Sequence, residues 1–352
     1  MAFTKRNQRT RARIRRIILA DTVRLGVIGA GYWGKKVIQE YTRLSKNELG
    51  LDLPIISDLK EDNLNYCNEV LKIPKENLTL DYMDMINSED IDAIHICTKN
   101  GSHYNIGRQV LDSKKHVLIE KPMTMNSREA LELRNIAASE SLVLKVGHIY
   151  RFNNAIGKLG KLTGEGYFGE IYCMNFQWVS LIESPSNTDI IYDLAPHPVD
   201  ISNDLLDRWP TRVQCKAKPY RRESLEEHAF ITMEYEDNLM VHIELSWLSP
   251  WKTRQITIVG SDRCARIDSL NQTIEIHENS DNRAFSLDVI RNNTIYDEVK
   301  NFVETIRAAH LMGAMSCSFL NDAPNGLNNV TVLEHLRTSL EQDRTVRIDY
   351  KE

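Results

Sequence analysis

The chain has 352 residues, of which 42% are hydrophobic and 26% are charged. This length suits two domains with separate cores, and the composition excludes a collagen-like, disordered or membrane-embedded chain. The formal net charge is −5, and the chain is more acidic still outside its basic first twenty residues, which argues against an enzyme that acts on nucleic acid.

Residues 1–21 form a basic extension that we exclude from the fold. The first twenty residues hold seven lysines and arginines and no acid, and the apolar run Ile17–Ala20 is too short for a signal peptide. We expect a solvated extension. Contact with a nucleic acid, a membrane surface or a partner protein, or an upstream start codon read in error, are the alternatives.

Residues 23–34, VRLGVIGAGYWG, contain a short apolar strand and then the motif G-x-G-x-x-G. Gly29 permits the tight turn, Gly31 lets a pyrophosphate approach the backbone, and Gly34 lets the following helix lie close to the strand. Asp58 ends the next apolar segment, about thirty residues after Gly29. A carboxylate there accepts hydrogen bonds from ribose hydroxyls and repels a 2′-phosphate, so we expect NAD rather than NADP.

Strands and helices alternate as far as residue 146. Asn126 and Glu129 form a capping box at the start of the last of these helices. The pattern predicts an α/β domain over residues 22–150, a doubly wound parallel sheet of the Rossmann type. The expected strands are 25–28, 53–57, 91–97, 116–119 and 143–146, and the expected helices are 35–44, 61–71, 104–113 and 127–140.

The pattern changes after Arg151, where long β-rich segments are joined by short turns. It predicts a second, α+β domain over residues 151–352 with a large, mostly antiparallel open sheet. Trp178, Trp247 and Trp251 lie in or beside this region, so we expect an apolar sheet face that forms a homodimer or homotetramer through residues 170–280. The expected segments are a helix at 155–163, strands within 166–180, 229–247, 254–267 and 273–277, and a final helix at 325–340.

Six cysteines are scattered along the chain without a C-x-x-C pair or histidines at metal-ligand spacing. We expect reduced, mostly buried thiols in a cytoplasmic protein, and no metal site.

Polar residues follow two of the expected parallel strands, where ligands of such sheets bind. Lys121 comes directly after the strand 116–119 and Glu120, and Pro122 keeps its backbone extended. A lysine is costly to bury, so one directed into a cofactor cleft either takes part in the function or forms an ion pair. The alternative is an ion pair between Lys121 and Glu120 at the surface.

His197 lies between Pro196 and Pro198, which suit the start of a helix. The positive end of the helix dipole favours a neutral imidazole, which is a competent general base. Asp193, four residues earlier, would hold one ring nitrogen of His197. A purely structural histidine at the start of the helix is the alternative.

These motifs, in this order, resemble the Gfo/Idh/MocA family of sugar and polyol dehydrogenases from about residue 23 to the end of the chain. The resemblance implies that Lys121 and His197 flank the reacting carbon, that Asp193 supports His197, and that a cis bond precedes Pro122. The motif positions and the resemblance together give the expected NAD-binding residues: Gly29, Gly31, Tyr32, Trp33, Gly34, Asp58, Thr98, Asn100, His103, Glu120, Lys121 and Pro122.

Two positions depart from the family pattern. Lys99 replaces the proline that is common in the T-P-N turn, and Pro198 replaces an aspartate that often follows the histidine in inositol dehydrogenases. Residues 147–153, GHIYRFN, are similar to the branch that oxidises nucleotide sugars, notably at C3 of UDP-N-acetylhexosamines. In that branch's pattern, Lys121, Arg151, Asn153, Asp193 and His197 would bind the substrate. Arg151 would alternatively anchor a hinge between the domains.

We therefore predict an NAD-dependent oxidoreductase that oxidises a secondary hydroxyl of a sugar, carried on a nucleotide. The alternatives are a dehydrogenase of free sugars, inositol or other polyols, and a regulatory protein that binds NAD without turnover.

Overall fold

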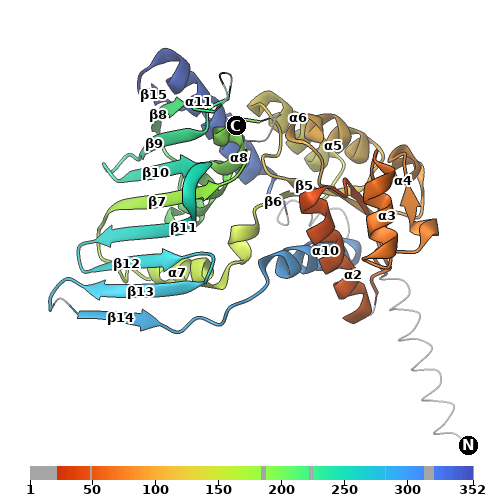
Figure 1. The fold of residues 1–352 in the computed structure, drawn as a ribbon, viewed down its shortest axis with the longest axis horizontal. Helices are drawn as coiled ribbons and strands as arrows, with labels where there is room; N and C mark the ends of the chain where they lie inside the picture. Colours follow the sequence, from red (N-terminus) through yellow and green to blue (C-terminus); the bar gives the residue numbers. More distant parts are fainter. Residues whose placement is uncertain are drawn as a thin grey trace, which may run out of the picture. The chain divides into compact units, whose positions relative to one another are not determined.

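The computed structural model describes residues 22–47, 50–183, 188–221, 223, 225–281, 283–312 and 321–351 (Figure 1). The basic extension 1–21 and Cys317 lie outside these residues. Packing divides the chain into two compact units. The first comprises the chain up to Glu120, Glu132–Val146 and Ile295–Ala323, and the second comprises Lys121–Leu131, Gly147–Thr294 and the chain from Pro324. The predicted domains, residues 22–150 and 151–352, are each continuous in the sequence, whereas each of the two units combines separate segments of the chain.

The first unit contains a six-stranded sheet in the order β3-β2-β1-β4-β5-β6. The four neighbouring pairs from β3 to β5 in this order are all parallel, and the order reverses between β1 and β4. The expected doubly wound sheet is therefore confirmed, and this reversal marks the place where such sheets bind ligands. The strands are β1 Leu25–Ile28, β2 Ile55–Ser57, β3 Leu78–Thr79, β4 Ala93–Ile96, β5 His116–Glu120 and β6 Leu144–Gly147.

Helices lie between these strands in the sequence, and one more comes from late in the chain. The cap of α6 is confirmed, because Asn126 Oδ1 accepts a hydrogen bond from Glu129 N at 2.9 Å. The late helix α10 was not predicted, although Val299, Phe302 and Ile306 belong to the same core as β1 and α2. The helices are α2 Tyr32–Asn47, α3 Glu61–Glu69, α4 Met83–Asn87, α5 His103–Asp112, α6 Ser127–Ser139 and α10 Thr294–Met312.

The second unit contains a nine-stranded sheet in the order β14-β13-β12-β11-β7-β10-β9-β8-β15 (Figure 1). All neighbours are antiparallel except β7 and β10, so the expected mostly antiparallel sheet is confirmed. The strands are β7 Ile171–Leu181, β8 Arg212–Lys218, β9 His228–Glu234, β10 Met240–Ser246, β11 Leu248–Gly260, β12 Arg263–Asp268, β13 Thr273–Glu278, β14 Arg283–Leu287 and β15 Val346–Arg347.

Alternate side chains of this sheet form one core with the helices of the unit, which are α7 Asn154–Gly164, α8 Ile190–Leu194, α9 Pro196–Leu206 and α11 Ala323–Gln342. Trp178 and Trp247 are fully buried in this core, whereas the side chain of Trp251 is exposed. The expectation that all three tryptophans mark an uncovered face is therefore wrong for Trp178 and Trp247, which point inward. In the part of the chain that the structure describes, we find no helix long and apolar enough to cross a membrane.

Candidate active site

The three motif glycines have different surroundings in the turn from β1 to α2. Gly29 has a φ of +99°, and a Cβ there would lie 2.7 Å from the carbonyl oxygen of Cys97. A Cβ on Gly34 would lie 1.9 Å from the carbonyl oxygen of Gly29, whereas a Cβ on Gly31 would meet no atom within 4 Å. Packing therefore requires the outer two glycines, and Gly31 leaves open space at the start of α2. This arrangement fits a dinucleotide diphosphate at a helix N-terminus.

Asp58 follows β2 and braces the glycine turn. Its Oδ2 accepts a hydrogen bond from Ala30 N at 2.7 Å, and its Oδ1 accepts one from Lys60 N at 2.8 Å. Each carboxylate oxygen has a second lone pair, so the half-buried side chain can still accept hydrogen bonds from ribose hydroxyls.

The loop after β4 lies against this turn, since the Cβ position of Gly29 is 3.1 Å from Thr98 N. His103 is fully buried at the start of α5, with Nε2 3.1 Å from Thr98 O. Asn100 lies in the intervening turn, and Lys99, which departs from the family pattern, is exposed. The structure thus brings the predicted cofactor loop and the glycine turn together within the first unit.

A hydrogen bond connects Trp33 of the glycine motif to the buried Glu120 at the end of β5. Trp33 Nε1 donates a 2.5 Å hydrogen bond to Glu120 Oε1, and His95 Nε2 lies 3.4 Å from the same oxygen. The predicted residue Tyr32 is instead 81% exposed at the start of α2. Metal-ligand atoms of His95, Cys97 and Glu120 lie within 4.8 Å of one another. Burial, followed by the nearby carboxylate of Glu120, raises the pKa of Cys97 well above its usual value, which disfavours the thiolate that binds metals.

Lys121 begins the second unit and is joined to the buried Pro122 by a cis bond, as the resemblance implied. Its Nζ donates to the carbonyl oxygen of Asp193 at 2.7 Å and lies 3.2 Å from Asp193 Oδ1. The two side chains are 19% and 24% exposed. Lys121 therefore pairs with Asp193, and the alternative surface pair with Glu120 does not form.

His197 lies in the first turn of α9, where Pro196 is accommodated because a helix start needs no donor at that position. Burial, and then the charges of Lys121, His148 and Arg254, lower the pKa of His197 well below its usual value. The imidazole is therefore neutral at pH 7, as predicted. The predicted hydrogen bond from Asp193 is wrong: among the described residues, the buried Nδ1 of His197 has no hydrogen-bond partner. Asp193 is directed to Lys121 instead.

Three neighbours of this group were not predicted, namely Tyr150, Trp178 and Arg254. The Tyr150 ring meets both the His197 ring and the Trp178 ring edge-on, each at 5.1 Å between centroids. Arg254 is only 9% exposed, and its guanidinium carbon lies 5.6 Å from the Trp178 ring centre. A sequence signal existed, because Arg254 alternates with the buried Ile256 and Ile258 of β11 and therefore faces the core.

Arg151 and Asn153 have structural partners. Arg151 makes a bidentate contact with Asp200, with Nε and Nη2 at 2.9 and 2.7 Å from Oδ1. Asn153 is 2% exposed; its Oδ1 caps α7 and its Nδ2 donates to Ser269 O at 2.9 Å. This geometry favours support of the site over contact with the substrate, because these polar atoms are already engaged.

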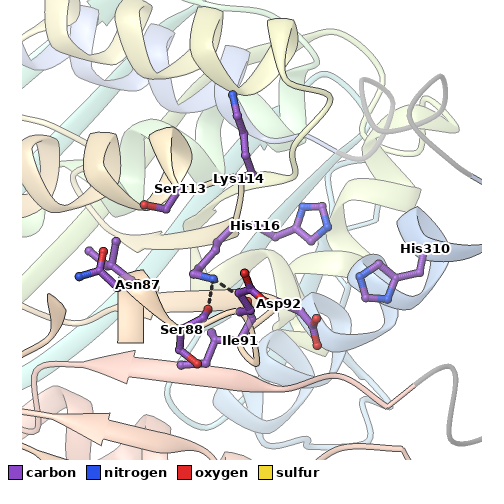
Figure 2. A pocket seen from close by; sticks show the side chains of 11 residues that line it. Asn87, Ser88, Ile91, Asp92, Ser113, Lys114, His116 and His310 are labelled. Atoms are coloured by element: carbon purple, nitrogen blue, oxygen red, sulfur yellow. Dashed lines mark hydrogen bonds between the residues drawn. The ribbon is translucent and has the colours of Figure 1, made fainter. Parts of the chain in front are cut away.

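A separate hollow of about 550 Å³ lies in the first unit, at the amino ends of β4 and β5 (Figure 2). His116, His310, Asp92 and Lys114 line it. It is at the opposite edge of the sheet from the glycine turn, so it is distinct from the expected cofactor site.

Known proteins similar in sequence to this chain include two dehydrogenases. Among the relatives, UDP-N-acetylglucosamine 3-dehydrogenase of Acidithiobacillus ferrooxidans is 25% identical, covering 82% of this chain and 90% of that protein. Inositol 2-dehydrogenase of Mycolicibacterium smegmatis is 27% identical over 53% of each chain.

Solved structures share the fold. The UDP-N-acetylglucosamine 3-dehydrogenase from Acidithiobacillus ferrooxidans superposes with a TM-score of 0.77 at 23% identity, covering 91% of this chain and 98% of that one. An inositol dehydrogenase homologue from Azotobacter vinelandii, complexed with NADH and myo-inositol, gives 0.82 at 20% identity, covering 95% and 99%.

Two family models identify the chain. Residues 23–148 match the NAD-binding Rossmann fold of an oxidoreductase family, and residues 156–266 match the C-terminal domain of the same family. The two matches cover about two thirds of the sequence and confirm the NAD-binding domain and an oxidoreductase whose homologues act on hydroxyl groups. The chain belongs to the Gfo/Idh/MocA oxidoreductase family.

Proposed function

We propose that this protein uses NAD to oxidise a secondary hydroxyl of a sugar carried on a nucleotide, such as C3 of a UDP-N-acetylhexosamine. The observation that carries the proposal is a neutral His197 in the same unit as the Lys121–Asp193 pair. The relative that spans most of the chain and acts on UDP-N-acetylglucosamine supports the nucleotide sugar. The inositol dehydrogenase relatives support the second candidate, a dehydrogenase of free sugars or polyols.

The chain's residues have separate tasks in this reaction. Bound NAD supplies the hydride acceptor. We assign the proton-accepting role to Nε2 of His197, because Nδ1 is buried and has no hydrogen-bond partner among the described residues. Nδ1 then carries the ring proton, and Nε2 accepts the proton of the substrate hydroxyl. Lys121 uses two donors on Asp193, and its third donor orients the hydroxyl and stabilises the developing negative charge.

Substitution of His197 tests this assignment. His197→Ala should reduce single-turnover NADH formation by about 10²- to 10⁴-fold, the usual effect of a positioned general base, without changing the Kd of NAD. The wild-type rate should fall at low pH as His197 gains a proton, at a pH below the usual histidine range because its pKa is lowered. This fall should be absent in the variant. His335→Asn, which alters a half-buried histidine of α11 outside both the site and residues 170–280, is the control.

Asp193→Asn should cause a smaller loss than Lys121→Ala, since it removes one contact of the lysine and keeps the backbone carbonyl bond. A His197→Ala enzyme with the wild-type rate and pH profile would contradict the mechanism. UDP-N-acetylglucosamine, glucose and myo-inositol as substrates separate the two candidate activities. NAD binding without turnover of any of them would favour a regulatory protein.

We also propose a cytoplasmic homodimer or homotetramer that associates through residues 170–280. The exposed side chains of Phe230 on β9 and Trp251 on β11, which are 58% and 75% accessible, support this interface. Free cysteines among the described residues support a reducing compartment. Light scattering at micromolar concentration should give a multiple of the chain mass, and a monomer would contradict the proposal.

A further inference from the structure

We propose that Arg254 binds a negatively charged group of the substrate, a carboxylate or a phosphate. The inference depends on the proposed function, because it assumes that the sugar binds at Lys121, Asp193 and His197.

Arg254 is a buried cation that has no carboxylate partner among the described residues. Its side chain is 9% exposed, and among the described residues no carboxylate oxygen lies within 4.0 Å of its nitrogens. Other partly buried arginines of the unit differ: Arg151 pairs with Asp200, and Arg337 pairs with Glu226. Burial of an uncompensated charge is costly, and the binding of an oppositely charged ligand offsets this cost.

The guanidinium is held in place while part of its hydrogen-bonding capacity remains. Nη1 donates to the carbonyl oxygens of Val179 and Thr253, both at 2.8 Å, and Trp178 lies on one side. An arginine has five N–H donors, so Nε and Nη2 carry three more. A planar fork fixed in this way suits bidentate binding of a carboxylate or phosphate.

Arg254 belongs to the candidate catalytic group. The Tyr150 ring contacts both the His197 ring and the Trp178 ring, and the guanidinium carbon of Arg254 lies 5.6 Å from the Trp178 ring centre. Asp193 acts on Arg254 electrostatically but is already paired with Lys121. With His197 neutral, the side chains of Lys121, Asp193, His197 and Arg254 together carry one net positive charge. A substrate with an anionic group balances this charge, whereas a neutral polyol leaves it uncompensated.

If Arg254 only stabilises the fold, a different experimental result is expected. The pairing of β7 and β11 shifts between Leu248 and Thr253, and the two bonds of Nη1 fasten the backbone next to this irregularity. If Arg254 only holds the backbone in place, its loss should change KM equally for every substrate. If Arg254 binds an anionic group, its loss should change KM only for charged substrates. The decisive readout is therefore the dependence of KM on substrate charge.

The experiment compares Arg254→Gln and Arg254→Lys with the wild type. The substrates are UDP-N-acetylglucosamine, its 6-carboxylate and free N-acetylglucosamine. If Arg254 binds a ring carboxylate, Arg254→Gln raises KM about 10- to 100-fold for the 6-carboxylate alone, the usual effect of losing a charged hydrogen bond. If it binds the diphosphate, KM rises for both UDP sugars and stays constant for the free sugar. Arg254→Lys should recover part of the loss, and Arg266→Gln on exposed β12 is the matched control.

Equal changes in KM for charged and neutral substrates, or no change, would overturn the inference. A second measurement uses thermal unfolding with UDP, glucuronate or glucose. UDP or glucuronate should stabilise the wild type more than Arg254→Lys, and glucose should not distinguish them. This measurement needs no turnover, so an enzyme inactive on every sugar would refute the proposed function while the anion inference stands or falls on its own. Equal stabilisation of both proteins by each anion would refute the inference.

Discussion

His116 is a buried histidine whose titration affects the stability of the first unit. It begins β5 and lines the hollow with His310, where the ring centroids are 5.8 Å apart (Figure 2). Its Nδ1 accepts a hydrogen bond from Val143 N at 3.0 Å. Burial, and then the charge of His310, lower the pKa of His116 from 6.5 to about 4.

The sign of the effect follows from this shift. Below pH 6.5 the unfolded chain takes up a proton at this histidine, whereas the folded chain does so only near pH 4. The stabilising contribution of neutral His116 is therefore complete above pH 6.5 and is lost as the pH falls. Between pH 7 and pH 5 this group alone should remove about 2 kcal/mol from the free energy of unfolding.

The test is urea unfolding of the wild type and His116→Asn at pH 7, 6 and 5. Asparagine cannot titrate, and its carbonyl oxygen can still accept from Val143 N. The wild type should lose about 2 kcal/mol more than the variant over this range. His197, which also titrates abnormally, is present in both proteins and cancels. His310→Asn, which keeps His116, should retain most of the wild-type slope. Parallel pH dependences of wild type and His116→Asn would refute the reasoning.

Three further substitutions test the cofactor site and a helix cap. Gly31→Ala should fold normally, because a Cβ there meets no atom within 4 Å, yet weaken NAD binding by about an order of magnitude in calorimetry; Gly157→Ala in α7, which is equally unobstructed and belongs to the second unit, should bind NAD normally. Asp58→Ser should improve NADP binding relative to NAD, and a wild type with equal Kd values for both would contradict the assigned role of Asp58. Asn126→Ala should lower the free energy of unfolding by about 1 kcal/mol, since it removes the 2.9 Å bond to Glu129 N, and an unchanged urea midpoint would contradict this.

Both sheets could be predicted from the sequence because the spacing of hydrophobic residues within each segment indicates its secondary structure without knowledge of distant contacts. The capping box at Asn126 and the apolar runs of β4 and β5 depend only on neighbouring residues. Helix α10 was missed although Val299, Phe302, Val303 and Ile306 recur at helical spacing. The local signal was present. Its packing with the first unit depends on contacts with residues far away in the sequence, which no local pattern specifies.

The candidate site shows the same limit. Lys121 and His197 were found from strand ends and flanking prolines, which are local signals. The partner of Asp193 could not be predicted from a local signal. The spacing between Asp193 and His197 in the sequence indicates that they are near each other but not in which direction the carboxylate points. The actual partner, Lys121, is 72 residues away. The alternation of β11 places Arg254 on the same face as the buried Ile256 and Ile258, but an alternating pattern does not specify which residues a charged side chain on that face will meet.

The observed pairing of Asp193 suits a general base better than the predicted one. A carboxylate bonded to His197 would favour the imidazolium and raise the pKa of His197, and it would leave Lys121 without a counter-charge. In the structure, Asp193 holds the ammonium of Lys121, while the cations of Lys121 and Arg254 add to burial in lowering the pKa of His197. The histidine is therefore kept unprotonated by its neighbours, and the lysine is kept in position by the acid. A positive group beside a neutral base suits the oxidation of an alcohol, because negative charge develops on the oxygen as its proton leaves, and in the proposed reaction Lys121 is that group.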